Sequence, residues 1–435
     1  MSKMKVEILF KDTIKPSSLT SHRLKTVELS FIDEKMAPVF VGGLFFYNYN
    51  GADKAEISGK LKNSLSETLT CFYPLTGRIN DKVIECNDEG ALFIEARASV
   101  LLSDLLVNPD PLTLVALMPS RSPKAELWPL LLVQVTFFSC GGFVLGVLIP
   151  HIVADVTTVS IFLRGWAATA RGHGDMVTPN YLSSSMIFPR LPHQEPYPMP
   201  KDERNHVTTK KPEFVTKRFV FEADKINLLK VRAASEQVKD PTRFESIVGL
   251  LWCCLTRATR SDNGVQKPSS VQFPVNIRNT NISPILSENS MGNIVLSVSV
   301  DTDGSETGLE QMVRKLRDNK EKTLEKFRTM EAMKFAEEYE KQRWDFMCRM
   351  ISGAIDGHIF TSWARTGFYE VDLGFGNPNW VTANNLNWEF EVFILMDTEN
   401  GRGIEVWVSL MNDKMSALEE DHELLQFATP NPSVV

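Results

Sequence analysis

One stretch decides the fold: Leu127–Ala168, which reads LWPLLLVQVTFFSCGGFVLGVLIPHIVADVTTVSIFLRGWAA. It carries no Lys, Arg, Asp or Glu before Asp155, and an uncharged run of that length could suggest a membrane span. However, Ser139–Gly142 and two prolines interrupt the run, and its Val, Ile, Leu and Phe residues fall into two lengths of about eight, the range of strands. The pattern therefore predicts two buried strands joined by a glycine turn.

The second of these strands, Phe143–Ile149, has no polar alternation. Such a strand is usually covered on both faces, as the central strands of layered α/β domains are. It leads to Pro150 and His151, after which apolar residues recur at spacings of three and four. This change of period predicts a helix that begins near Asp155.

His151 is thus expected at a strand-to-helix junction, four residues before Asp155. A histidine there could act as a general base, because its unperturbed pKa of about 6.5 lets it accept a proton at cytosolic pH. The alternative is a core or capping histidine beside an N-terminal Asp. Since the pattern His-x-x-x-Asp is short and common, the motif alone leaves both open.

Composition narrows the class of protein. The chain has 435 residues, of which 43% are hydrophobic and 23% charged, which predicts a soluble globular protein of about two domains. The net charge of −7 argues against a nucleic-acid-binding surface. The six cysteines show no Cys-x-x-Cys spacing, and no secretory signal is visible, so free thiols in a reducing cytoplasm are expected.

Several common catalytic motifs are absent from the sequence. There is no Gly-x-Ser-x-Gly elbow, phosphate-binding loop, dinucleotide glycine fingerprint or His-Glu-x-x-His helix. Serine hydrolases, nucleotide hydrolases and zinc proteases are thereby disfavoured. We expect no metal and no permanently bound cofactor.

The rest of the chain predicts two domains around a linker. Residues 183–213 are rich in proline and charge, which predicts a crossover linker between domains at 1–182 and 214–435. Outside it, the periodicity predicts helices and strands. The main ones are an amphipathic helix at Lys54–Tyr73, charged helices within Gly308–Met350, strands at Phe368–Val371, Phe390–Met396 and Ile404–Leu410, and a closing helix at Lys414–Phe427.

Taken together, several stretches resemble one family, the plant BAHD acyl-CoA-dependent acyltransferases. The similarity runs in order along nearly the whole chain. It resembles most the branch of vinorine synthase, salutaridinol acetyltransferase and acylsugar acyltransferases, through KPSSLTSHRL and FYEVD. The matching residues are His151, Asp155, Phe162 and Trp166-Ala167, then Leu61–Ile79, Val275–Asn293, Thr361–Pro378 and the strand GIEVWVSL.

The resemblance implies an α/β fold of two chloramphenicol-acetyltransferase-like domains, with mixed sheets flanked by helices and a crossover loop between them. A solvent channel would separate the domains. Acyl-CoA, as co-substrate, would enter from one face and the acceptor from the other, and they would meet at His151.

It also implies roles for individual residues. His151 would be the general base, and Asp155, paired with an Arg away from the channel, would orient it. Asp372 would pair with Arg278 and shape a structural loop. The same loop would contain Gly374, Phe375 and Gly376. Thr242 and Arg243 would contact CoA. Arg365 would contact the acceptor.

Four residues depart from the family pattern. Pro150 replaces the common Ser before the histidine, and Val156 replaces the Gly after the aspartate. The glycine loop has Leu373 for Phe and Phe375 for Trp, which removes an indole donor. These changes leave the general base in place and bear on donor fit and efficiency.

The expected function is transfer of an acyl group, with acetyl-CoA as the first guess, to a hydroxyl of a plant specialised metabolite such as an alkaloid, sugar ester or terpenoid alcohol. No covalent enzyme intermediate is expected. We expect a cytoplasmic monomer without nucleic-acid or membrane partners. The alternatives are a non-catalytic accessory protein on the same fold, and a condensation domain, whose usual second histidine would stand where Pro150 does.

Overall fold

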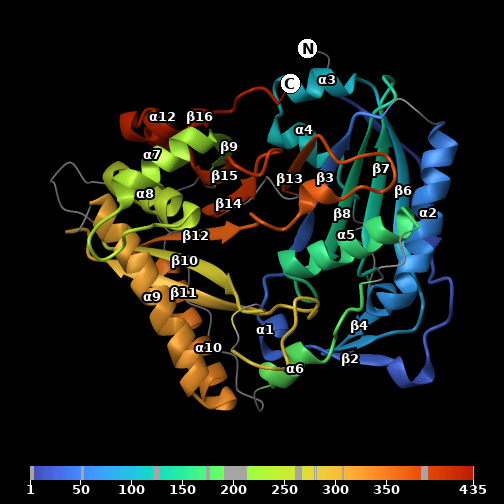
Figure 1. Cartoon of the computed structure of the whole chain (residues 1–435), viewed down its shortest axis with the longest axis horizontal. Coiled ribbons are helices and arrows are strands. Elements are labelled where there is room, and N and C mark those ends of the chain that lie inside the picture. The colour runs from blue at the N-terminus through green and yellow to red at the C-terminus, as the bar shows by residue number, and fades with distance from the viewer. Residues whose placement is uncertain are drawn as a thin grey trace.

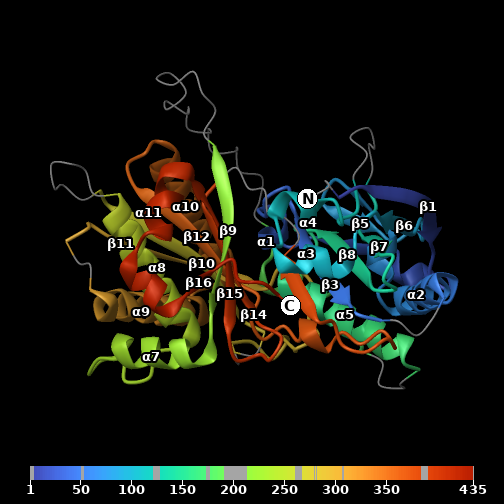
Figure 2. The ribbon, with the colours of Figure 1, turned by 90° about the horizontal axis from the view of Figure 1, so that it is seen from above.

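The structure, a computed structural model, describes residues 4–49, 53–120, 128–172, 177–190, 213–259, 267–278, 280, 282–305, 308–383 and 390–434. Two halves lie side by side, and each contains a sheet flanked by helices (Figures 1 and 2). This arrangement confirms the expected two-part α/β fold. No described helix combines the length and apolarity needed to cross a bilayer.

The N-terminal half is built on a six-stranded mixed sheet that contains both strands of the deciding stretch. Its order is β1 (Val6–Ile14), β6 (Ala91–Ala98), β7 (Leu132–Phe137), β8 (Phe143–Pro150), β3 (Phe40–Tyr47) and β13 (Trp380–Ala383). As predicted, β7 and β8 pair antiparallel and every residue of β8 is buried. The run is therefore sheet core.

Two helices, α2 (Lys54–Cys71) and α5 (Val156–Ala170), pack together over this sheet. The Trp166 indole N–H donates to Ser64 Oγ at 2.9 Å, and Phe162 meets Phe72 edge to face. The Phe and Trp that follow the His-x-x-x-Asp motif are thus core residues. They fix α5, and with it the segment that carries His151.

Smaller elements complete this half. A three-stranded sheet comprises β2 (Thr26–Glu28), β5 (Val83–Glu85) and β4 (Arg78–Asn80). The short helices are α1 (Phe31–Glu34), α3 (Leu102–Val107), α4 (Pro111–Val115), α6 (Ser183–Ile187) and the 3-10 turns His22–Leu24 and Tyr73–Thr76.

The C-terminal half is built on a seven-stranded sheet. Its order is β11 (Val295–Thr302), β10 (Ser269–Asn276), β12 (Asp356–Ser362), β14 (Val392–Asp397), β15 (Ile404–Met411), β9 (Phe214–Phe221) and β16 (Thr429–Pro430). The helices are α7 (Ala223–Ala233), α8 (Arg243–Ala258), α9 (Leu309–Thr329), α10 (Ala332–Ile351), α11 (Asn412–Glu419) and α12 (His422–Phe427).

Two local expectations were wrong. Phe368–Val371 is not a strand, because Gly367 takes a left-handed conformation (φ 71°) and starts a 3-10 turn at Phe368–Glu370. The closing helix is interrupted, because the Asp421 carboxylate accepts the N–H groups of Glu423 and Leu424 and caps a new helix. In both cases a local backbone geometry overrides the apolar pattern.

One strand crosses between the halves. β13 lies between β12 and β14 in sequence but pairs antiparallel with β3, with Trp380 opposite Phe46. A division of the chain at residue 213 therefore assigns β13 to the half whose sheet it does not join. Of the predicted linker, 191–212 lie outside the described residues, and Ser183–Ile187 form α6.

Candidate active site

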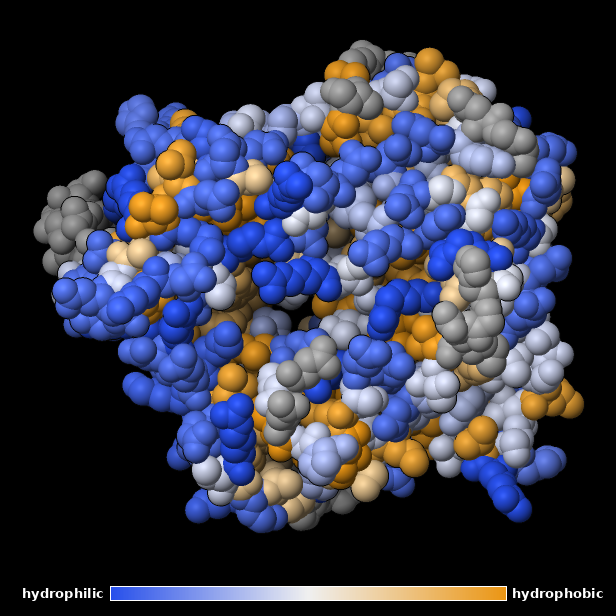
Figure 3. All heavy atoms as spheres, viewed as in Figure 1, coloured by the Kyte–Doolittle hydropathy of each residue, from blue (hydrophilic) through white to orange (hydrophobic). Residues whose placement is uncertain are grey.

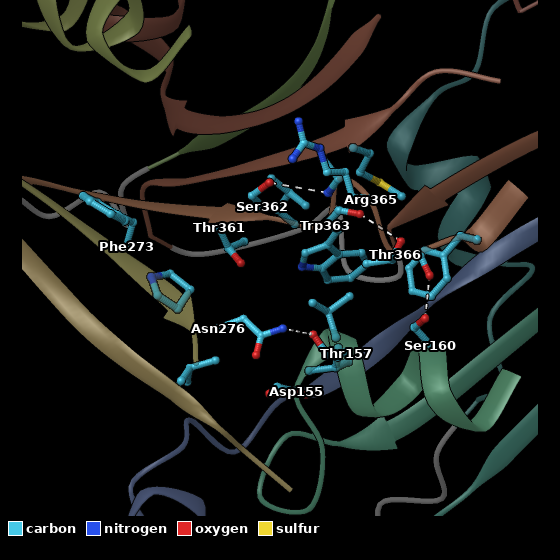
Figure 4. Close-up of a pocket in the computed structure, with 18 of the residues that line it drawn as sticks. Asp155, Thr157, Ser160, Phe273, Asn276, Thr361, Ser362, Trp363, Arg365 and Thr366 are labelled. Atoms are coloured by element: carbon cyan, nitrogen blue, oxygen red, sulfur yellow. Dashed lines mark hydrogen bonds between the residues drawn. The ribbon is translucent and has the colours of Figure 1, made fainter. Parts of the chain in front are cut away.

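A cavity of about 1110 Å³ lies between the two halves and is lined by both. Its walls come from the start of α5, from β10 and β14, and from the segment that leads from β12 to the 3-10 turn. Figure 3 shows a hollow near the middle of the molecular face. Figure 4 shows side chains from α5, among them Thr157 and Ser160, facing Asn276 of β10 and Trp363.

His151 lines this cavity. Strand β8 ends at Pro150, and the His151 N–H donates to Val39 O at 2.8 Å. Helix α5 then begins at Val156 with Asp155 as its N-cap, whose Oδ1 accepts the Thr158 N–H at 2.8 Å. The predicted junction and helix start are confirmed, and the junction holds the imidazole at the cavity wall.

The surroundings of His151 favour its neutral form. Burial lowers the pKa of His151 below its ordinary value of 6.5, and the charge of Asp155 opposes this only in part. A neutral imidazole has a lone pair that can accept a proton at neutral pH. Nδ1 is buried and has no hydrogen-bond partner in the described part of the chain.

Asp155 forms an ion pair with Arg278. Arg278 Nη1 and Nη2 donate to the two carboxylate oxygens at 2.7 and 3.0 Å, and the Ile294 N–H adds a contact at 3.1 Å. The Arg278 side chain is 0% exposed and that of Asp155 5%. Asp155 caps α5 of the N-terminal half, and Arg278 follows β10 of the C-terminal half. This ion pair therefore joins the two halves close to His151.

The expected pair of Arg278 with Asp372 was wrong. Asp372 Oδ1 instead accepts the backbone N–H groups of Gly374, Phe375 and Gly376, at 2.7, 3.1 and 2.9 Å. Gly374 and Gly376 have φ of 87° and 85°, a region that favours glycine. The charge of Asp372 is stabilised by these three backbone N–H groups. Arg278 forms its ion pair with Asp155 instead.

The Asp372–Gly376 loop packs on the N-terminal half. The Phe375 ring meets Tyr49 and Phe143 with centroids 5.2 and 5.5 Å apart, and the Lys60 ammonium lies 5.0 Å from it. None of the loop residues is among the described residues that line the cavity. Phe375 thus fills its place by apolar packing, and no indole donor is required there.

The two residues expected to contact CoA are Thr242 and Arg243. Thr242 caps α8 in a capping box with Glu245. Arg243 donates to Asp397 Oδ1 at 3.1 Å and to Gly401 O at 2.9 Å. Asp397 and Gly401 line the cavity, whereas Thr242 and Arg243 are not among its described lining residues.

Arg365 does line the cavity. It has a left-handed backbone (φ 62°), and its N–H donates to Asp397 Oδ2 at 2.5 Å. Figure 4 shows its guanidinium extending away from Asn276 and Thr157. It is therefore placed toward the Asp397 side of the cavity.

Sequence reasoning missed two asparagines. Asn276 Nδ2 donates to Thr157 Oγ1 at 3.1 Å across the cavity (Figure 4). Asn293 Nδ2 donates to the His151 carbonyl oxygen at 2.7 Å. Both asparagines lie in stretches that resemble the family, but asparagine is common in turns, so its residue type gave no signal there.

A buried charged cluster lies outside the cavity lining. His358 Nδ1 is 2.7 Å from Glu391 Oε2, and Lys414 Nζ binds Asp356 and Glu391 at 2.5 and 2.6 Å. Burial alone would lower the pKa of His358, but Asp356 and Glu391 outweigh it and raise the pKa to about 9. With the ammonium of Lys414 already between the carboxylates, the cluster does not fit a metal ion.

Comparisons with known proteins agree with this geometry. The Transferase family matches residues 4–425. The BAHD acyltransferase BIA1 of Arabidopsis thaliana is 35% identical over 442 residues, with 99% of both chains covered. Vinorine synthase of Rauvolfia serpentina is 32% identical over 428 residues, which cover 95% of this chain and 96% of that protein.

Solved structures show the same fold. The crystal structure of vinorine synthase aligns with a TM-score of 0.82 at 29% identity and covers 99% of this chain and 100% of its own. TRI101 of F. graminearum, in complex with coenzyme A and T-2 mycotoxin, aligns with a TM-score of 0.71 at 16% identity, covering 93% of this chain and 99% of its own. His151 lines a cavity between the two halves, and the chain is similar to these proteins over its full length in both sequence and fold. The chain therefore belongs to the Transferase family and, within it, to the BAHD acyl-CoA-dependent acyltransferases.

Proposed function

We propose that this protein transfers an acyl group, with acetyl-CoA the first donor to test, to a hydroxyl of a plant specialised metabolite. The observation that carries the proposal is the position of His151, which lines a cavity with walls from both halves of the molecule. An alcohol and a thioester that enter this cavity can both approach the His151 imidazole. The other cavity residues shape and orient the two substrates.

The reaction follows from a neutral imidazole. His151 takes the hydroxyl proton as the alcohol oxygen attacks the thioester carbonyl carbon, which gives a tetrahedral intermediate and an imidazolium. The carbon–sulfur bond then breaks, the ester is released, and the CoA thiolate takes the proton from the imidazolium. The base is restored, and no covalent enzyme intermediate forms.

The class of acceptor is inferred from the lining and from the relatives. The cavity walls include apolar side chains, among them Val156, Trp363 and Ile394. Relatives with 33% and 34% identity bear the names stemmadenine O-acetyltransferase, from Catharanthus roseus, and limonoid 7-O-acetyltransferase, from Citrus sinensis. Both points favour a bulky, rather apolar alcohol such as an alkaloid or terpenoid.

The remaining roles complete the proposal. Arg243 and Thr242 would steady the rim where CoA enters, and Arg365 would contact the acceptor or donor near Asp397. All six cysteines are free, which suits a reducing cytoplasm. We propose a monomer there.

The test is an assay with acetyl-CoA and pooled plant alcohols, read by thiol release and by mass spectrometry of the ester. His151→Ala should abolish ester formation, whereas His22→Ala, at an exposed histidine outside the cavity lining, should not. Equal ester from His151→Ala would refute the general base. If a donor-by-acceptor screen gave no ester with the unaltered protein, the accessory role would replace the enzymatic one.

A further inference from the structure

A second, smaller pocket adjoins the reaction cavity. This side pocket has a volume of about 210 Å³ and lies between β11, α9 and α10 of the C-terminal half (Figure 1). Ser297 and Tyr339 line both the side pocket and the cavity that His151 lines, so the two spaces meet at these residues. Hydroxyl and amide groups line the side pocket, among them those of Ser299, Asn319 and Gln342.

The alternation of residues in β11 explains why polar groups face the side pocket. Val298 and Val300 are buried in the apolar core of the C-terminal half, whereas Ser297 and Ser299 are half-buried. Successive residues of a strand face opposite sides of a sheet. The two serines therefore lie on the other face of the sheet from these valines, and there they line the side pocket.

A polar strip connects the side pocket to the cavity. Gln272 of β10 lies opposite Ser299 of β11, and its Nε2 donates to Ser299 Oγ at 3.2 Å. Gln272 lines the cavity, whereas Ser299 lines the side pocket. Asn276 is four residues farther along β10 and contacts Thr157 of α5. A molecule that extends from Asn276 into the side pocket therefore spans roughly 14 Å, the length of four residues in an extended strand.

The side pocket lies away from the rim where CoA is proposed to enter. That rim includes Asp397, at the end of β14, and Gly401. In the sheet order, β11 is an edge strand, and β10 and β12 separate it from β14. Since neighbouring strands lie about 4.8 Å apart, the two regions are about 14 Å apart across the sheet. With acyl-CoA at the β14 rim, the side pocket is open to the acceptor.

The groups of the side pocket suit a neutral ligand with several hydroxyls. The serine hydroxyls and the side-chain amides of Asn319 and Gln342 can each donate and accept, which matches the hydroxyls of a sugar. The buried ring of Tyr339 adds an apolar surface for the C–H groups of such a ligand. An anion would meet the carboxylate of Glu338, which lines the pocket and pairs with Lys326. Charges of both signs thus favour a polyhydroxylated group over a phosphate or carboxylate.

We propose that the side pocket binds a glycosyl or similarly polyhydroxylated group of the acceptor, while a distant hydroxyl of the same molecule reaches His151. Such an acceptor combines an apolar body, which fits the cavity walls, with a polar end that lies beyond Ser297 and Tyr339. The assignment of the pocket to an acceptor rests on the proposed function, but the class of group that the pocket binds does not.

The test uses three probes that share one hydroxyl-bearing chain: octanediol, its monoglucoside and its monophosphate. Calorimetry measures their affinities for the full chain without acyl-CoA, and mass spectrometry then detects esters formed with acetyl-CoA. We expect the monoglucoside to bind about tenfold more tightly than octanediol, the value of one or two added hydrogen bonds. The monophosphate should show no such gain.

Two variants assign this gain to the side pocket. Ser299→Leu places an apolar side chain in the pocket, so it should remove the advantage of the monoglucoside and leave the affinity for octanediol unchanged. Gln342→Ala should weaken the monoglucoside by about 2- to 10-fold, because one hydrogen-bonding amide is lost. Gln311→Ala is the matched control, since Gln311 is an exposed glutamine of α9 outside the described lining of both spaces. It should change no affinity.

Three results would overturn the proposal: no gain for the monoglucoside, tighter binding of the monophosphate, or a gain that survives Ser299→Leu. If octanediol is acylated while the monoglucoside shows no gain that depends on Ser299, the side-pocket proposal fails and the proposed function stands. If the monoglucoside binds through Ser299 but no alcohol is acylated, the proposed function fails, while the class of group that the side pocket binds is confirmed.

Discussion

Arg278 binds both carboxylate oxygens of Asp155 and thereby ties β10 to the first turn of α5. The same guanidinium donates to the carbonyl oxygens of Ser290 and Gly292. These contacts connect the cap of the helix that follows His151 to the loop that ends at Asn293. The arrangement around the imidazole therefore depends on contacts between the two halves.

Removal of Arg278 should strongly destabilise the protein. Arg278→Ala leaves the Asp155 charge buried without its partner, and we expect the free energy of unfolding to fall by about 3–5 kcal/mol. Denaturant unfolding measures this. Arg97→Ala, at the exposed pair of Arg97 with Glu7, should cost less than about 1 kcal/mol. Similar losses in the two variants would show that the buried pair contributes no more than a surface pair.

The separation of Arg278 from the glycine loop predicts additivity. Asp372→Ala removes the acceptor of three N–H groups and should cost about 1–3 kcal/mol. Combined with Arg278→Ala, its effect should add within about 0.5 kcal/mol, because the two residues share no contact. Denaturant unfolding of both single variants and the double variant gives the coupling. A coupling energy well above that value would indicate a direct interaction between Arg278 and Asp372, which the structure does not show.

The pH dependence of kcat/KM should report His151. Burial lowers the pKa of His151 below 6.5, and a general base works only when unprotonated. Activity should therefore hold above pH 6.5 and fall as the pH drops through the lowered pKa. A pH profile with a fixed acceptor measures the limb. An acid limb above pH 6.5 would show that nearby negative charge outweighs burial.

The buried His358 cluster should make stability fall at alkaline pH. The pKa of His358 is raised to about 9 from an ordinary 6.5. The stabilisation that comes from the charged His358 is fully present below pH 6.5 and is lost as the pH rises through about 9. It amounts to about 3 kcal/mol. Urea unfolding between these pH values measures the slope. His358→Phe should flatten it, and an unchanged slope in that variant would assign the effect to other groups.

Parts of the site could be predicted because their signals are local. Uninterrupted apolar residues marked β8, and the change of period marked α5, so the strand end and the helix start could be placed within a residue or two. His151 followed from that junction. The Phe162 and Trp166 positions followed from the resemblance to the family, and the structure places them against α2.

Other parts could not be predicted. The partner of Arg278 lies 123 residues away in sequence, and charge alone did not distinguish Asp155 from Asp372. The choice depended on which carboxylate was already satisfied by backbone N–H groups. Asn293 donates to the carboxylate of Asp33, which is likewise 260 residues away, and nothing in either local pattern indicates the other.

The sequence by itself determined the strand, the histidine and the capped helix, because backbone conformation follows from residues close along the chain. The tertiary structure alone decided which carboxylate Arg278 binds, which oxygens hold the amide of Asn293, and that β13 completes the N-terminal sheet. Those contacts form only when the two halves pack together, since buried polar groups pair with whatever partner the packing brings within hydrogen-bond distance.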